Sequence, residues 1–427
     1  MAAQPMHAPR WETTLVGRTW ELGSLTGILD QSVYGQGGIV SVIGPPGIGK
    51  SRMVRETTAI ARARGVEVFS AFCESLTMTV AFGVAAQLLR SVVGVTDLDD
   101  AGAREHIRNR FPGAEPDDLL LVADLVGLAN ADTALADISP DARRRRLTRL
   151  FQSASVSRQS PALFIVEDVH WIDDASESML ADFIEVVPQT RSMVLMTWRS
   201  EYDGALARVP NSQRIVLGSL SDAESAALTA ELLGADPSVA DLISLITARA
   251  SGNPFFAQEI VRDLVERRVL VGQRGAYVGR DNGTAIEVPD TLQAAIASRI
   301  DRLAASAKLT LNAAAVLGTR FGEDDLEAMV DGACLQELLQ AQLIDQVSVT
   351  PRAECVFHHP VIRTVAYESQ LKSQRAQLHR RVTAAIEDRD PASAHANAAL
   401  IAASRDGWRP AGGLCVAHAC RGVARLR

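Results

Sequence analysis

One eight-residue pattern constrains the fold of this 427-residue chain more than any other feature of its sequence. It reads GPPGIGKS, matches G-x-x-x-x-G-K-[ST] in full, and stands between a β-branched run, Ile39 to Ile43, and a stretch with helical spacing, Ser51 to Arg64. Glycines let backbone N–H groups close around phosphate oxygens, and the helix N-terminus adds a partial positive charge. The pattern predicts a phosphate-binding loop at the end of a strand in an α/β fold.

Different residues of this loop are expected to make different contacts with a nucleotide. The glycines free the backbone, the lysine directs a full charge toward the β and γ phosphates, and the serine hydroxyl suits a Mg²⁺ ligand. Lysine occurs at only three positions in the chain, 50, 308 and 372, which makes the loop lysine conspicuous. With ATP, ADP or a close purine analogue as ligand, the predicted nucleotide-binding residues of the loop are Gly44, Pro45, Pro46, Gly47, Ile48, Gly49, Lys50, Ser51 and Arg52.

A second part of the site is expected at the end of another strand. Four apolar residues, 163–166, precede Glu167 and Asp168, whose carboxylates would emerge at the carboxyl edge of a parallel sheet, where ligands bind. A P-loop needs such groups to hold the Mg²⁺ shell and to align water. The usual order is Asp then Glu, so the reversed order leaves open which of the two holds the metal. Ser51, Glu167 and Asp168 are the predicted magnesium ligands, partly through water.

Two further candidates are weaker when taken alone. Arg199 ends a strand-like run, 193–197, and is either a sensor of the γ-phosphate or a surface arginine. Pro254 lies in a Ser-Gly-Asn-Pro breaker between helical stretches, where a rigid turn can lean on an adenine ring or simply end a helix. With Glu167 and Asp168, Arg199 completes the predicted catalytic residues.

Composition and charge restrict the class of protein. An apolar fraction of 47% and a charged fraction of 22% are globular averages, and the length predicts several domains. The net charge of −8 argues against a whole-chain interaction with nucleic acid or anionic lipid. No apolar run of membrane-spanning length and no secretory signal are found, and the five cysteines form no metal-binding or disulfide pattern. We expect a cytoplasmic protein with reduced cysteines.

Spacing patterns predict an α-rich chain of several domains. Strand-like runs alternate with helical stretches as far as residue 218, which predicts a parallel sheet. The expected division is an N-terminal extension, 1–13; a P-loop α/β domain, 14–218; a helical lid, 219–280; a winged-helix domain of helices closed by a short hairpin, 286–372; the start of a helical repeat, 373–400; and an irregular tail, 401–427. The tail is interpreted either as disordered or as out-of-frame translation of a GC-rich gene, and no function is placed there.

Taken in order, the motifs of residues 15–387 resemble the bacterial AAA-type ATPase module of the STAND class, which is Orc1-like and occurs in large LuxR-type regulators and beside class III adenylate cyclase domains. The P-loop is its most specific element. The other matching residues are Leu15-Val16-Gly17-Arg18, Glu21-Leu22, Glu167 to Asp174, Thr197-x-Arg199, Gly252 to Phe256, Val288-Pro289, Arg299-x-Asp301-x-Leu303, Ala313 to Gly318, Phe357 to Pro360, and Arg375-x-x-x-Leu378-His379.

The resemblance implies further roles for individual residues. Val16, Gly17 and Arg18 would pack near the adenine, and Pro254 would touch the base from the lid. Glu167 and Asp168 would share the Mg²⁺ and water roles, and Arg199 would sense phosphate. His359 matches a winged-helix histidine that reaches the bound diphosphate in related switch ATPases, with a buried structural histidine as the alternative. His170 and Trp171 are interpreted as structural.

These features predict an ATP-binding regulatory ATPase switch with slow Mg²⁺-dependent hydrolysis coupled to domain rearrangement. We expect nucleotide as a ligand and a protein partner or self-association, and neither nucleic acid nor membrane for this chain alone. Relatives carry a cyclase domain before the module, or helical repeats and a helix-turn-helix after it, and this sequence shows neither. Two alternatives follow: an ATP-dependent transcriptional regulator fragment that binds DNA through its winged helix, and a truncated remnant of an adenylate cyclase or LuxR-type protein.

Overall fold

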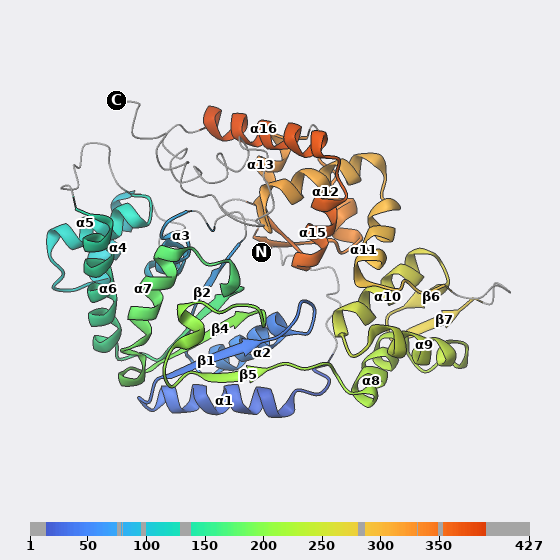
Figure 1. Ribbon diagram of the computed structural model, residues 1–427, viewed down its shortest axis with the longest axis horizontal. Coiled ribbons are helices and arrows are strands. Elements are labelled where there is room, and N and C mark those ends of the chain that lie inside the picture. Colours follow the sequence, from blue (N-terminus) through green and yellow to red (C-terminus); the bar gives the residue numbers. More distant parts are fainter. Residues whose placement is uncertain are drawn as a thin grey trace, which may run out of the picture.

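A computed structural model describes residues 14–74, 78, 80–94, 100–128, 138–280, 287–330, 332–348 and 353–389. The N-terminal extension 1–13, residues 390–400 of the expected repeat and the tail 401–427 lie outside these ranges. In Figure 1 a sheet with helices on both faces occupies the lower left, a small helical unit lies to the right, and a third helical unit lies above the sheet. No described helix combines the length and apolarity needed to cross a membrane.

The predicted parallel sheet is confirmed, with five strands in the order β2-β3-β4-β1-β5, all parallel. The strands are β1 (Gly38–Ile43), β2 (Glu67–Phe72), β3 (Ala162–Glu167), β4 (Ser192–Trp198) and β5 (Gln213–Val216). Every residue of β3 and β4 is buried, as the apolar runs suggested. Because β4 separates β1 from β3, its carboxyl end lies between the ends of the strands that carry the glycine loop and the acidic pair.

Helices cover both faces of this sheet. One face packs on α1 (Thr19–Val33) and α2 (Lys50–Ala63). The other packs on α3 (Gly83–Val93), α7 (Asp174–Ile184) and the short turn η3 (Ala205–Arg208). Beyond α3 lies a helical layer of α4 (Asp100–Arg110), α5 (Pro116–Leu125) and α6 (Pro140–Ser157). Burial on both faces explains why the inner strands read as continuous apolar runs.

The second unit, here called the lid, contains α8 (Asp222–Leu233), η4 (Pro237–Val239), α9 (Ala240–Ala250), α10 (Pro254–Glu266) and a hairpin of β6 (Leu270–Gln273) and β7 (Ala276–Gly279). Its helices begin where the sequence supplies caps. Ser221 and Glu224 form a capping box at α8, and the Asn253 side chain accepts from the first N–H groups of α10. After α10 the lid ends in this hairpin, over residues 270–279.

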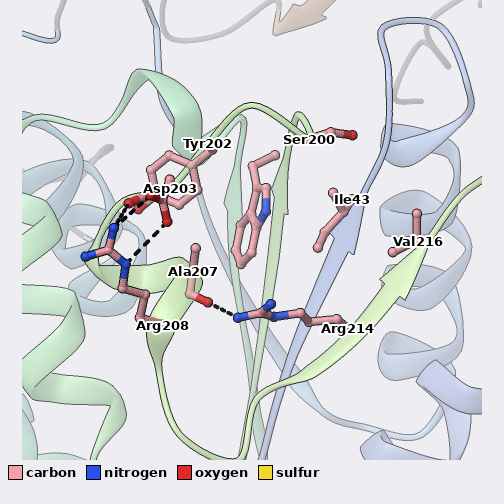
Figure 2. Close-up of a pocket in the computed structure, with 9 residues that line it drawn as sticks. Ile43, Ser200, Tyr202, Asp203, Ala207, Arg208, Arg214 and Val216 are labelled. Atoms are coloured by element: carbon pink, nitrogen blue, oxygen red, sulfur yellow. Dashed lines mark hydrogen bonds and ion pairs between the residues drawn. The ribbon is translucent and has the colours of Figure 1, made fainter.

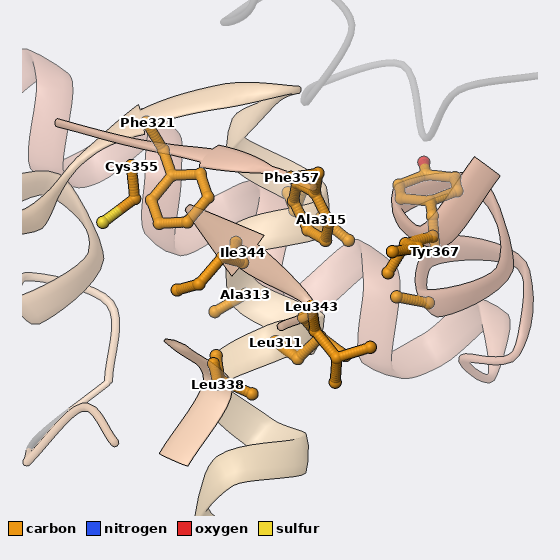
Figure 3. Packing of buried hydrophobic residues seen from close by; sticks show 14 of the residues in the cluster. Leu311, Ala313, Ala315, Phe321, Leu338, Leu343, Ile344, Cys355, Phe357 and Tyr367 are labelled. Atoms are coloured by element: carbon orange, nitrogen blue, oxygen red, sulfur yellow. The ribbon is translucent and has the colours of Figure 1, made fainter. Parts of the chain in front are cut away.

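The third unit, here called the C-terminal unit, packs helices on a three-stranded antiparallel sheet in the order β8-β10-β9. Figure 3 shows its apolar core, in which Phe321, Ile344 and Phe357 from the three strands meet Leu311 and Ala315 of a helix. The elements are α11 (Leu292–Asp301), α12 (Ala305–Leu317), β8 (Arg320–Gly322), α13 (Glu323–Glu327), α14 (Leu335–Gln340), β9 (Ile344–Ser348), β10 (Glu354–Phe357), α15 (Pro360–Glu368) and α16 (Lys372–Arg389).

Candidate nucleotide-binding site

The glycine loop joins the end of β1 to the start of α2 in a conformation that needs glycine. Gly47 has φ 79° and Gly49 has φ 111°, both in the region that L side chains rarely adopt. A Cβ on Gly47 would also lie 2.9 Å from Asn253 Oδ1 of the lid. The loop leads into the N-terminus of the 14-residue helix α2. The partial positive charge at this end of the helix favours a bound anion.

Lys50 lies over this loop instead of extending into solvent. Its Nζ donates to the carbonyl oxygens of Gly44, at 2.8 Å, and Pro45, at 3.1 Å, and the residue is 8% exposed. Burial lowers the pKa of this ammonium, an effect that the negative charge of Asp168 opposes. The lysine charge is thus held beside the loop and within range of the acidic pair.

The acidic pair lies at the carboxyl end of β3, and its two members have different neighbours. Glu167 is buried, and burial raises the pKa of its carboxyl to about 7, while a hydrogen bond from the Ser51 hydroxyl acts in the opposite direction. Asp168 has φ 55°, and its backbone N–H donates to Thr197 Oγ1 at 2.9 Å. Burial also raises the pKa of Asp168, against the attraction of Lys50 and Arg199. Ser51 therefore joins the loop to Glu167, and Thr197 of β4 fixes Asp168.

Arg199 follows β4 and lies within electrostatic range of Lys50 and the acidic pair. Its guanidinium carbon is 6.0 Å from the centre of the Trp171 ring. Its positive charge lowers the pKa values of Lys50 and His170 and favours the ionised form of Asp168. The structure therefore brings Arg199 to the acidic pair.

The lid touches the loop through Asn253. Its Nδ2 donates to Pro46 O at 3.1 Å, while its Oδ1 accepts from the backbone N–H groups of Phe255 and Phe256. The Phe255 N–H also lies 3.4 Å from Gly47 O. Pro254, which the sequence predicts to touch the base from the lid, is the first residue of α10 and directly follows Asn253. An asparagine directly preceding a helix-starting proline was a usable signal for this cap.

Residues 14–18 link the sheet domain to the lid. Thr14 donates its backbone N–H to Glu231 of α8, at 2.8 Å, and Val16 packs against the apolar core of the lid. Arg18 precedes α1, donates to Gly218 O and forms an ion pair with Glu21. The structure thus places this segment, predicted to lie near the adenine, between the lid and the sheet domain.

His359 of the C-terminal unit stacks on a lid side chain. Its ring centre is 3.9 Å from that of Phe255, with the two planes 20° apart. Its Nδ1 accepts from the Val361 N–H at 3.1 Å, so it caps α15. Burial lowers its pKa to about 3, and the charges of Lys50 and Arg199 contribute to this shift. His359 is therefore within electrostatic range of the loop lysine.

Two residues of the predicted set have other described partners. Arg52 pairs with Glu56 one turn along α2, with 2.6 Å between the charged groups, so its described partner lies on the helix and not on the loop. Ile48 is 2% exposed and packs in the core between the sheet and α2, so its side chain is structural.

The donor atoms at this site fit a magnesium ion bound together with phosphate. A serine hydroxyl and two carboxylates are hard oxygen ligands of the kind that Mg²⁺ prefers. Within the described part of the chain, no group of three or more His, Cys, Asp or Glu residues could hold a metal ion. Phosphate oxygens and water would therefore have to complete the coordination shell around Ser51, Glu167 and Asp168.

A separate hollow of about 340 Å³ lies beside this site, at the β5 edge of the sheet. Figure 2 shows Ile43 and Val216 on its strands, with Arg208 paired to Asp203 and Arg214 donating to Ala207 O. Lys50, Glu167 and Asp168 do not line it, and its two arginines already have protein partners. We do not assign the nucleotide to this hollow.

Comparison with known proteins agrees with this geometry. Residues 14–196 match the family model described as the AAA ATPase domain, and residues 221–271 match one described as a domain of unknown function. The fold around the sheet is that of a P-loop NTPase. Residues 14–196 are an AAA-type ATPase domain.

The relatives extend the likeness over most of the chain. An uncharacterized protein of Rhizobium meliloti is 27% identical over 405 residues, which are 87% of this chain and 37% of that protein. This chain therefore spans little more than a third of that relative's length. A signal transduction ATPase with numerous domains (STAND) and a tetratricopeptide repeat sensor, from Pyrococcus horikoshii, has a TM-score of 0.50 at 15% identity, covering 93% of this chain and 50% of that one. The Aeropyrum pernix Orc1 protein, solved in complex with DNA, gives 0.41 at 15% identity, covering 86% of this chain and 96% of that one.

Proposed function

We propose that this chain is an ATP-operated switch of the STAND type, in which ATP or ADP with Mg²⁺ holds the lid and the C-terminal unit against the sheet domain. Magnesium would be bound through Ser51, Glu167 and Asp168, with phosphate on the loop and Lys50. Val16, Gly17, Arg18 and Pro254 are the proposed neighbours of the base. The domain limits expected from the sequence, including a winged-helix domain over 286–372, are part of this proposal.

The observation that carries the proposal is a continuous path of contacts from the loop to the C-terminal unit. Asn253 of the lid donates to Pro46 O of the loop, and Phe255 follows it on the same helix. The Phe255 ring packs in the apolar core of the C-terminal unit and stacks on His359. A change in the contacts of the loop when nucleotide binds would therefore be transmitted to the lid and to the C-terminal unit.

A buried ionic cluster joins the lid to the C-terminal unit beside this path. Glu259 of α10 is fully buried and accepts from Arg262 of the same helix and from Arg299 of α11. Arg262 also lies 3.0 Å from His358 Nε2, and His358 Nδ1 lies 2.8 Å from Asp345 of β9. Because a buried charge is costly without its partners, this cluster favours movement of the lid and the C-terminal unit as one body.

The C-terminal unit also contacts the sheet next to the acidic pair. The Arg320 guanidinium carbon is 4.2 Å from the centre of the Phe72 ring at the end of β2. The next residue, Cys73, donates its N–H to Glu167 O at 2.9 Å. ATP and ADP would make different contacts here, because only ATP has the terminal phosphate, and this difference can favour one of two arrangements of the three units. Slow hydrolysis would make the ATP-bound arrangement long-lived.

Replacement of the loop lysine tests the proposal. Lys50→Ala removes charge-assisted hydrogen bonds worth about 1.5–3 kcal/mol each, so we expect the Kd for MgATP to rise about tenfold to a hundredfold in calorimetry. Lys308→Ala is the control, because Lys308 pairs with Asp301 on the surface of the C-terminal unit. Equal ATP affinity of Lys50→Ala and wild type would refute the proposed function.

A further inference from the structure

His170 is a buried histidine beside the acidic pair to which the proposed function gives no role. It lies in the short turn η1 (Val169–Trp171), two residues after Asp168, and its side chain is 10% exposed. Its ring is tilted 44° against that of Trp171, with 5.2 Å between the ring centres. Packing against Trp171 alone would make it structural, as the sequence suggested.

The hydrogen bonds of this imidazole do not fit a purely structural role. Both ring nitrogens are buried, and neither has a hydrogen-bond partner among the described residues. The other buried or partly buried histidines differ: His358 bonds through both nitrogens, His359 caps α15, and His379 bonds to the Tyr367 hydroxyl at 2.9 Å. Leaving a buried polar group unpaired costs about 1–3 kcal/mol, so such groups are rare in folded proteins.

The surroundings of His170 belong to the proposed nucleotide site. Its Nδ1 lies 3.9 Å from Asp168 Oδ1, beyond a hydrogen bond. Arg199 and Lys50 lie within electrostatic range of this ring. A neutral imidazole offers one N–H donor and one acceptor nitrogen. The ring therefore lies beside Asp168 and within electrostatic range of Arg199 and Lys50, all of which belong to the predicted nucleotide site.

We propose that His170 distinguishes nucleoside triphosphate from diphosphate, because its imidazole hydrogen-bonds the terminal phosphate or the water that this phosphate holds. This inference rests on the proposed function and adds a residue to it. A diphosphate offers His170 no such partner, so the imidazole gains its hydrogen bond only in the triphosphate complex. His170 then acts beside Arg199 in reading the state of the nucleotide.

The test compares His170→Phe with wild type in the presence and absence of nucleotide. Phenylalanine keeps a ring against Trp171 and removes both nitrogens. Without nucleotide we expect the thermal midpoint to stay equal or to rise, because two unpaired polar atoms are gone. Affinity for MgATP should fall about tenfold to a hundredfold, the range of one hydrogen bond to a charged phosphate, while affinity for MgADP should not change. His170→Asn, which keeps a donor and an acceptor, should restore part of the ATP preference.

His379→Phe is the matched control, since His379 is buried, hydrogen-bonded and part of the C-terminal unit. It should lower the thermal midpoint and leave the ratio of ATP to ADP affinity unchanged. The inference is overturned if His170→Phe behaves in the same way, or if it does not fold. If Lys50→Ala loses ATP binding while His170→Phe keeps the wild-type ratio, this inference fails and the proposed function stands. Wild-type binding by Lys50→Ala removes both.

Discussion

Glu167 and Asp168 are neighbours in the chain, but their contacts suggest different tasks. The Ser51 hydroxyl bonds to Glu167, whereas Asp168 faces the charges of Lys50 and Arg199. Since Ser51 is one of the proposed magnesium ligands, we infer that Glu167 is the main support of the metal shell and that Asp168, which contacts the shell through water, aligns the attacking water. This assignment accounts for the reversed order of the two acids, Glu then Asp.

The assignment predicts distinct effects of the two amide substitutions. Asp168→Asn should retain MgATP binding and lower the hydrolysis rate about a hundredfold or more, the usual contribution of a general base. Glu167→Gln should instead weaken the magnesium dependence of binding. Steady-state hydrolysis and magnesium titrations measure both, with the exposed Asp174→Asn at the start of α7 as control. The opposite pattern would reverse the two roles.

Among individual residues, the sequence predicted those whose proposed role depends on the local backbone conformation. The loop glycines and Lys50 are recognisable because the turn needs positive φ values and the phosphate site needs a charge. The contact of Asn253 with Pro46 joins residues 207 positions apart. No periodicity encodes such a pairing, so the sequence did not indicate this contact. Likewise, only the folded environment of His170 shows that its nitrogens have no hydrogen-bond partner among the described residues.

Among the elements, α10 has two tasks at its first turn. Asn253 caps the helix and also binds the loop, so Asn253→Ala should cost about 1 kcal/mol of stability through the lost cap and weaken ATP binding as well. Thr291→Ala is the matched control, because the Thr291 side chain caps α11 and has no described contact with the loop. Thermal melts and calorimetry separate the two effects. If both variants lower ATP affinity equally, the contact with Pro46 has no part in binding.

Strand prediction succeeded for the fully buried strands β3 and β4 and missed the edge strand β5. Strands β3 and β4 are buried along their whole length, so their apolar runs were found within about a residue of their ends. In β5 only Ile215 is buried, and the neighbouring residues are exposed. The pattern of a two-sided core is absent there. The parallel pairing of β5 with β1 depends on tertiary contacts, and the residue pattern of this short segment does not predict it.

At the scale of the whole molecule, the cluster around Glu259 tests whether the lid and the C-terminal unit move together. Glu259→Gln leaves Arg262 and Arg299 buried without their shared carboxylate, which should cost about 3–5 kcal/mol. Hydrogen exchange should then show ATP-induced protection confined to the loop and lost from α15. Asp290→Asn, in the exposed pair with Arg249, should leave protection unchanged. Persistent protection of α15 in Glu259→Gln would show that the cluster does not link the units.

The connection from β5 to α8 joins the sheet domain to the lid, and the segment 14–18 lies against it. Thr14 donates to Glu231 of the lid, and Arg18 donates to Gly218 O of the connection. Two residues after Gly218, the Leu220 N–H donates to Gly252 O at 2.9 Å, so the connection is held to the residue that precedes Asn253. We infer that a rotation of the backbone near Gly218 would shift Asn253 relative to Pro46 and so change the contact between the lid and the loop.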